Sequence, residues 1–86
     1  MESYRIEFAA NVRKDFRKIP KREAERILES IQALSAGPRP PGSIKLKGEA
    51  LYRLRVGIYR VVYEIEDNVL LIVIVRVQHR KDVYRD

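Results

Sequence analysis

Residues 52–65, Y-R-L-R-V-G-I-Y-R-V-V-Y-E-I, decide the fold of this chain. Apolar and polar residues alternate on both sides of Gly57, which is typical of two half-buried strands joined by a tight turn. If residues 57 and 58 form the turn, Arg55 pairs directly with Arg60. The other pairs of this register are Val56 with Tyr59, Leu54 with Val61, Arg53 with Val62, and Tyr52 with Tyr63.

This register separates the side chains by chemistry. The tyrosine and aliphatic residues share one face, and Arg53, Arg55 and Arg60 emerge together on the other. Like charges directly opposite each other destabilise a sheet by roughly 0.2–1 kcal/mol. Because guanidinium groups bind phosphate oxygens in pairs and keep their charge, the cluster favours a phosphate-binding site. The alternative is a solvated basic face whose long side chains splay apart.

The residues before this hairpin predict a strand and two helices. Residues 4–8 alternate as a strand does, and apolar residues at helical spacing predict a helix over residues 9–18. Pro20 opens a second helix that runs to about Ser35, and its apolar stripe needs a sheet to cover it. The segment A-G-P-R-P-P-G-S, residues 36–43, then forms a surface loop.

The rest of the chain predicts strands. I-K-L-K-G, residues 44–48, is a short candidate, and residues 51–56, 58–66 and 69–78 are longer ones. The last is apolar at nearly every position, which indicates a central strand. The order β-α-α-β-β-β predicts an α+β fold, with a helical hairpin on one face of a mainly antiparallel sheet. The length, 86 residues, suits a single domain over 1–86.

The second turn extends the arginine face. With Asp67 and Asn68 as its corners, Glu66 pairs with Val69 and Arg60 with Val75. This register adds Val73, Val75, Val77 and His79 to the face that carries Arg60. The tail continues with further basic and aromatic residues: Arg80, Lys81, Tyr84 and Arg85.

Such a face has the charge to stabilise RNA cleavage, but arginine does not lose its proton and cannot act as a base. His79 is the only histidine, and Tyr84 is a second group for proton transfer or for stacking on a base. Taken singly, His79 reads more simply as a strand-end histidine without a role, and Tyr84 as a tail aromatic that packs back on the sheet. Their position beside the arginines favours a function for both.

The composition of the chain indicates which kinds of partner and which cellular location to expect. The net charge of +6 favours polyanionic partners such as RNA, DNA, a ribosome or an acidic protein. The chain has no cysteine, no signal peptide is visible, and no apolar run approaches the roughly 20 residues that span a bilayer. We therefore expect a cytoplasmic protein without a membrane partner. No His/Asp/Glu set has the spacing of metal ligands, so we expect no metal and no cofactor.

Three segments together resemble the C-terminal half of RelE toxins, of the RelE/ParE superfamily: Y-R-L-R-V-G, Y-R-V-V-Y-E-I and the terminal H-R-K-D-V-Y. Y-R-I-E-F-A-A-N-V-R-K-D-F-R-K-I-P, the helical hairpin and I-K-L-K-G are similar to the remainder, so the resemblance covers essentially the whole chain. It implies the toxin of a type II toxin–antitoxin pair. Such a toxin is a metal-independent, ribosome-dependent endoribonuclease that cuts messenger RNA in the ribosomal A site through 2′-hydroxyl attack.

The resemblance also implies roles for residues. Arg53 and Arg55 match the basic pair of the hairpin, and Arg60 matches the arginine that contacts the scissile phosphate. In the tail, Arg80 matches the basic residue, with His79 as the alternative, and Tyr84 matches the C-terminal tyrosine. Some RelE proteins carry lysines in place of Arg53 and Arg55, so here proton transfer is assigned to His79 or Tyr84. The expected catalytic set is Arg55, Arg60, His79, Arg80 and Tyr84, and the RNA-binding set is Arg53, Arg55, Arg60, Lys81 and Arg85.

Two other functions remain open at this point. ParE toxins share the fold and poison DNA gyrase, and a catalytically weak RNA- or ribosome-binding module is a third class. The His/Tyr pair in the tail favours the ribonuclease. The partners implied are the ribosome, messenger RNA and a cognate antitoxin with an acidic, partly disordered segment. We expect DNA contact only through the complex with the antitoxin.

Overall fold

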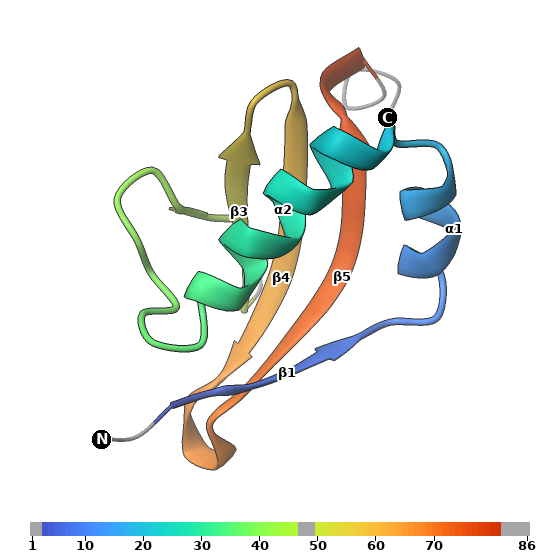
Figure 1. Cartoon of the computed structure of the whole chain (residues 1–86). Helices are drawn as coiled ribbons and strands as arrows, with labels where there is room; N and C mark the ends of the chain where they lie inside the picture. The colour runs from blue at the N-terminus through green and yellow to red at the C-terminus, as the bar shows by residue number, and fades with distance from the viewer. Residues whose placement is uncertain (1–2, 47–49, 82–86) are drawn as a thin grey trace.

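The computed structural model describes residues 3–46 and 50–81 of the chain. Its elements are β1 (Arg5–Phe8), α1 (Val12–Arg17), α2 (Lys21–Ala33), β2 (Ile44–Lys45), β3 (Leu51–Val56), β4 (Tyr59–Glu66), the 3₁₀ turn η1 (Asp67–Val69) and β5 (Leu71–His79). The strands form a sheet in the order β1-β5-β4-β3-β2, with β1 parallel to β5 and the other pairs antiparallel. The α+β fold predicted from the sequence is confirmed, with α2 lying across β3, β4 and β5 (Figure 1).

Element boundaries differ from the predictions at the ends. The first helix begins at Val12 rather than residue 9, because the chain is still bound to the sheet there: the Ala9 N–H donates to the Ile74 carbonyl at 2.9 Å. Pro20 stands just before α2, in an extended conformation (φ −55°, ψ 145°), so its ring costs the helix no hydrogen bond. The strand predicted over residues 44–48 is limited to β2, and residues 47 and 48 of that prediction lie outside the described residues.

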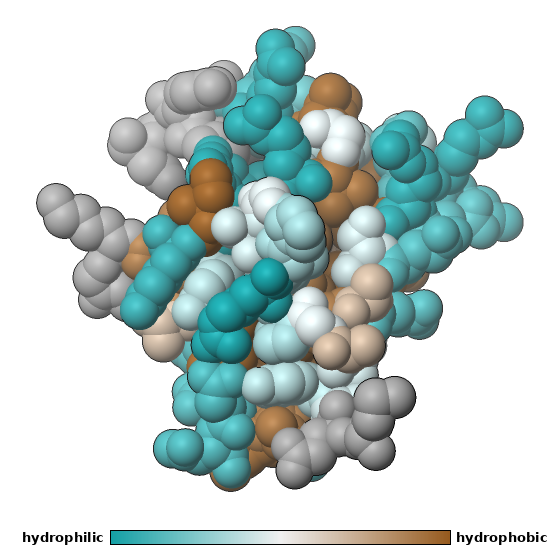
Figure 2. Space-filling view, turned by 90° about the vertical axis from the view of Figure 1, so that its left-hand side faces the viewer, coloured by the Kyte–Doolittle hydropathy of each residue, from teal (hydrophilic) through white to brown (hydrophobic). Residues whose placement is uncertain are grey.

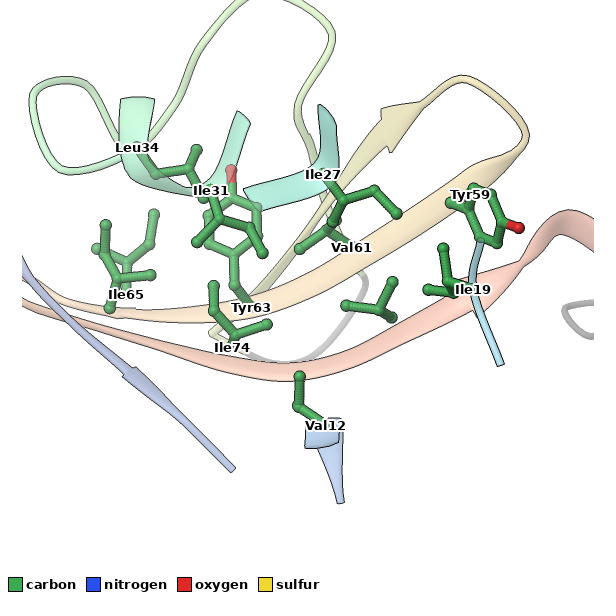
Figure 3. Close-up of a cluster of buried hydrophobic side chains, with 12 residues drawn as sticks. Val12, Ile19, Ile27, Ile31, Leu34, Tyr59, Val61, Tyr63, Ile65 and Ile74 are labelled. Atoms are coloured by element: carbon green, nitrogen blue, oxygen red, sulfur yellow. The ribbon is translucent and has the colours of Figure 1, made fainter. Parts of the chain in front are cut away.

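The predicted register between β3 and β4 is confirmed at every pair, including Arg55 opposite Arg60. The apolar face of this hairpin lies under α2, where Ile27, Ile31 and the C-cap residue Leu34 are at most 1% exposed (Figure 3). Tyr63 is also fully buried, and its hydroxyl donates to the Pro38 carbonyl at 2.8 Å. Burying this side chain therefore leaves no polar group without a partner.

α1 lies beside β5, where β1 has ended, and it binds the backbone that β1 leaves open. The Asn11 amide donates to the Val75 carbonyl at 2.9 Å, and the Asp15 carboxylate accepts from the Val77 N–H at 2.9 Å. Because residues four apart lie on one side of a helical turn, one short element satisfies both backbone groups. Val12, between them, is buried in the core (Figure 3).

The predicted register between β4 and β5 is wrong. Residues 67–69 form η1 and Leu70 adopts a left-handed conformation (φ 52°), so Glu66 pairs with Leu71 instead of Val69. The register then shifts again between Val62 and Tyr63, where Val75 is the extra residue of a β-bulge. The turn shifts the pairing by two residues relative to the prediction, so each side chain of β5 stays on its predicted face of the sheet. The bulge shifts the pairing by one more residue, so the residues of β5 beyond it lie on the face opposite to the predicted one.

A cluster of polar side chains connects the loop after α2 with η1. The Arg39 guanidinium forms an ion pair with Asp67 (Nη2–Oδ2, 2.8 Å) and lies over the Tyr52 ring at 5.1 Å from its centroid. The Tyr4 hydroxyl donates to the other Asp67 oxygen at 2.7 Å. Segments that are distant in the sequence therefore meet at one exposed carboxylate.

The interactions of the Asp67 carboxylate should make the stability of the fold depend on pH. The hydrogen bond from Arg39, and then that from Tyr4, lowers the pKa of Asp67. A lowered pKa stabilises the folded chain above the unfolded-state value, about 3.9, and this contribution is lost as the pH falls through the folded-state pKa. Urea midpoints measured from pH 5 to pH 2 should therefore fall less steeply for Asp67→Asn than for the parent. The exposed Glu25 has no ion pair in the described part of the chain, so Glu25→Gln should behave as the parent, and equal slopes for all three proteins would contradict the prediction.

Viewed from the side of the proline-rich loop, the surface is largely hydrophilic, with separate small apolar patches (Figure 2). Across residues 3–46 and 50–81, no helix is long and apolar enough to span a bilayer.

Candidate phosphate-binding site

Two rows of side chains cross the face of the sheet that α2 does not cover. One row runs from Arg55 on β3 through Arg60 on β4 to Gln78 on β5. The other runs in the same direction and consists of Arg53, Val62 and Arg76. Neighbouring strands are about 4.8 Å apart, and the two rows are separated by about 6.8 Å along the strands. We call these six residues the arginine face.

The arginines of this face are accessible to a ligand. Arg55 and Arg76 are exposed, and Arg53 and Arg60 are half-buried. In the described part of the chain, none of the ion pairs involves Arg53, Arg55 or Arg76. A phosphate between Arg55 and Arg60 would accept hydrogen bonds from both guanidinium groups.

The same side of the sheet becomes acidic toward the other end of β4. Glu64 and Glu66 follow Val62 at intervals of two, and Glu64 is placed opposite Val73. Partial burial, and then the hydrogen bond and charge of Glu66, raise the pKa of Glu64. An anion that approaches the sheet is therefore attracted to the arginine end and repelled from the glutamate end.

His79 does not lie on the arginine face, so that prediction is wrong. It is paired with Tyr59, on the side that faces the helices, and its ring packs edge-on against the Tyr59 ring at 5.4 Å. The bulge at Val75 is the cause, because one extra residue reverses the faces of the following positions. The His79 Nδ1 accepts a hydrogen bond from the Lys81 N–H at 3.0 Å. This hydrogen bond joins His79 to the backbone just beyond the end of β5.

The tail begins next to the first row. The Arg80 N–H donates to the Ile58 carbonyl at 2.8 Å, which holds the end of β5 against the turn between β3 and β4. Arg80 and Lys81 are both exposed. Tyr84 and Arg85, the other predicted tail residues, lie outside the described residues.

Arg76 and Gln78 belong to this surface although the sequence reasoning missed them. Both lie beyond the bulge, and an unbulged register places them on the helix side. A signal was nevertheless present, because Arg76 is the only charged residue in the otherwise apolar run L-L-I-V-I-V-R-V, residues 70–77. A charge there needs an exposed position, which only the shifted register supplies.

The described residues contain no group of three or more His, Cys, Asp or Glu side chains that could hold a metal ion. The guanidinium groups of the arginine face are the groups on this surface whose chemistry suits an anion such as phosphate.

Comparison with known proteins identifies the class. The family model described as the ParE toxin of the type II toxin–antitoxin system parDE matches residues 6–84. The chain therefore belongs to this family of type II toxins, and it is of the RelE type.

The RelE assignment comes from individual relatives. The toxin RelG of Mycobacterium tuberculosis is 33% identical over 84 residues, which cover 95% of this chain and 97% of that protein. In the RelB–RelE complex of Pyrococcus horikoshii, the matching chain is 32% identical with a TM-score of 0.81, over 96% of this chain and 98% of that one. In the RelBE2 toxin–antitoxin complex of M. tuberculosis, the matching chain is 32% identical with a TM-score of 0.79. The match covers 91% of this chain and 99% of that one.

Proposed function

We propose that this toxin is a metal-independent endoribonuclease that cuts translated messenger RNA in the ribosomal A site. The observation that carries the proposal is the direct pairing of Arg55 with Arg60 on the sheet face that α2 does not cover, with Arg53 two residues away on the same side. Two guanidinium groups placed opposite each other repel, and their donors converge on a site that suits an anion. An RNA phosphate is the anion whose geometry suits paired guanidinium groups.

In this proposal Arg60 and Arg55 stabilise the charge that develops on the scissile phosphate during attack by the 2′-hydroxyl. Arg53, Lys81 and Arg85 bind neighbouring phosphates. We assign proton transfer to the tail residues Tyr84 and Arg80, because the ring of His79 lies on the opposite side of the sheet from the arginines. His79 instead positions the tail through its hydrogen bond with the Lys81 N–H.

If Tyr84 transfers a proton, its substitution should affect messenger cleavage much more than ribosome binding. Tyr84→Phe removes the hydroxyl but keeps the ring, so cleavage of messenger RNA on programmed ribosomes should fall by a factor of about 10²–10⁴, the usual range for a general acid or base. Ribosome binding, measured by co-sedimentation, should stay close to that of the parent. An equal loss of cleavage and binding would assign Tyr84 to docking instead.

A cognate antitoxin is the second partner we propose. Two of the relatives compared above were solved as toxin–antitoxin complexes. The net charge of +6 suits an acidic, partly disordered segment that covers the toxin. Whether a second small gene lies immediately beside this one is the simplest observation that bears on this partner.

Messenger 5′ ends mapped after induction of the protein test the proposed function. We expect new ends within translated codons and none in untranslated regions. Stalled gyrase–DNA complexes without such cuts would instead assign the chain the action of ParE toxins, whose family model it matches. Growth arrest with neither cuts nor gyrase complexes would leave the RNA- or ribosome-binding module as the function.

A further inference from the structure

Arg76 lies where the arginine face meets the edge of β5 that α1 borders. It is the last residue of the row that starts at Arg53, and it also lines a hollow of about 300 Å³ at that edge. The other residues of the hollow are Asp15, Lys18, Ile19, Tyr59, Val77, Gln78 and His79. The open face and the hollow therefore form one continuous surface that turns around the edge of the sheet.

The charges of the hollow favour an anion. Lys18 and Arg76 are both exposed and contribute positive charge. The carboxylate there belongs to Asp15, and its Oδ2 already accepts a hydrogen bond from the Val77 N–H at 2.9 Å. Among the described residues, neither Lys18 nor Arg76 has an ion pair, so both are available to bind phosphate.

The spacing of the rows suits successive phosphates. Arg55 and Arg60 lie in one row and Arg76 in the other, about 6.8 Å further along the strands. Neighbouring phosphates of an extended RNA strand are separated by a similar distance. A strand whose scissile phosphate lies at Arg60 can therefore place the next phosphate at Arg76 without leaving the protein surface.

We propose that Arg76, with Lys18 across the hollow, binds the messenger-RNA phosphate adjacent to the one that Arg55 and Arg60 hold. The RNA then crosses the sheet from β3 to β5 and leaves over the edge that α1 borders. This inference rests on the proposed function and adds a flanking subsite to it. Since Arg76 would bind the flanking phosphate equally before and during the reaction, it contributes to KM and not to kcat.

The test uses ribosomes programmed with a messenger that carries a 2′-deoxynucleotide at the cleavage position, so that the toxin binds without cutting. Binding constants are measured over a range of salt concentrations. For Arg76→Gln, the slope of log K against log salt should become shallower by about 0.7, the value for one lost single-strand phosphate contact. Arg76→Lys should keep the parental slope, because it keeps the charge. The matched control is Arg22→Gln on α2, an exposed arginine that neither belongs to the arginine face nor lines the hollow, and it should leave the slope unchanged.

Three results would overturn the inference. The first is an Arg76→Gln slope equal to that of Arg22→Gln. The second is a salt slope for Arg76→Gln that is still shallower than that of the parent on ribosomes whose messenger ends before the A site. The phosphate that Arg76 binds would then belong to ribosomal RNA. The third is a loss of affinity for an acidic antitoxin peptide without any change in binding to programmed ribosomes.

The failure of this inference can be told apart from that of the proposed function. If the parent cuts translated codons but Arg76→Gln keeps its KM and its salt slope, the flanking subsite is absent and the ribonuclease stands. If the parent binds programmed ribosomes through Arg76 but never cuts a normal messenger, the subsite stands and the ribonuclease does not.

Discussion

Replacing Arg60 with alanine should abolish toxicity. In the proposed reaction Arg60 lies at the centre of the first row, opposite Arg55, and contacts the phosphate on which charge develops. The loss of one such charge-stabilising donor typically lowers kcat by a factor of about 10²–10³. Single-turnover cleavage on programmed ribosomes, together with growth after induction, measures this effect. We expect Arg60→Lys to recover only part of the rate, because an ammonium group cannot bind phosphate in the bidentate manner of a guanidinium.

Two controls make this result specific. Circular dichroism and a urea midpoint close to that of the parent show that Arg60→Ala is folded. Arg22→Ala, on the exposed side of α2, removes the same charge from the molecule without touching the arginine face and should stay fully toxic. If Arg60→Ala remains as toxic as the parent, the arginine face is not the active surface.

The largest effect on stability is expected for Ile74→Ala. Ile74 is 0% exposed, and it is placed opposite both Tyr63 on β4 and Phe8 on β1. Removing its side chain leaves a cavity in the centre of the sheet, and such changes lower the free energy of unfolding by about 2–5 kcal/mol. For a chain of this size, each kcal/mol lowers the melting temperature by about 4–8 °C. Calorimetry and urea denaturation both measure this loss.

The matched control is the same substitution at an exposed position. Ile44, on the edge strand β2, is 48% exposed, and Ile44→Ala should change the free energy of unfolding by no more than about 0.5 kcal/mol. Ile74→Val removes only one methylene group and should cost about 0.5–1.5 kcal/mol, which keeps the comparison measurable even if Ile74→Ala does not fold. Similar losses at positions 44 and 74 would mean that the core is not centred on β5.

The sequence predicted the arginine hairpin correctly because the residues that determine its register lie within the hairpin itself. Gly57 has a positive φ of 61°, which suits the tight turn, and the alternation on either side of it permits one register. A slip by one residue would have exposed Tyr63 and buried arginine, so the burial of one face specifies every pair. The positions of Arg53, Arg55 and Arg60 therefore followed from residues 52–65 alone.

The position of His79 could not be predicted in the same way. β5 is apolar on both faces along most of its length, so no alternation marks which residues face α2. In such a strand the cost of a one-residue shift is small, and the residue at the bulge, Val75, makes contacts with distant parts of the chain. One of these is the bond from Asn11 to the Val75 carbonyl, made by a residue 64 positions away.

The two polar side chains that α1 places along β5 also affect how copies of this protein meet one another. An open strand edge is a template on which a second chain can add a strand, and repeated addition leads to cross-β fibres. Beyond Phe8 the Val75 carbonyl and the Val77 N–H would form such an edge, but Asn11 and Asp15 already occupy both groups. At the opposite side of the sheet, in the part of the chain that the structure describes, β2 spans two residues, Ile44 and Lys45. One short helix thus protects the strand that carries much of the core against self-assembly.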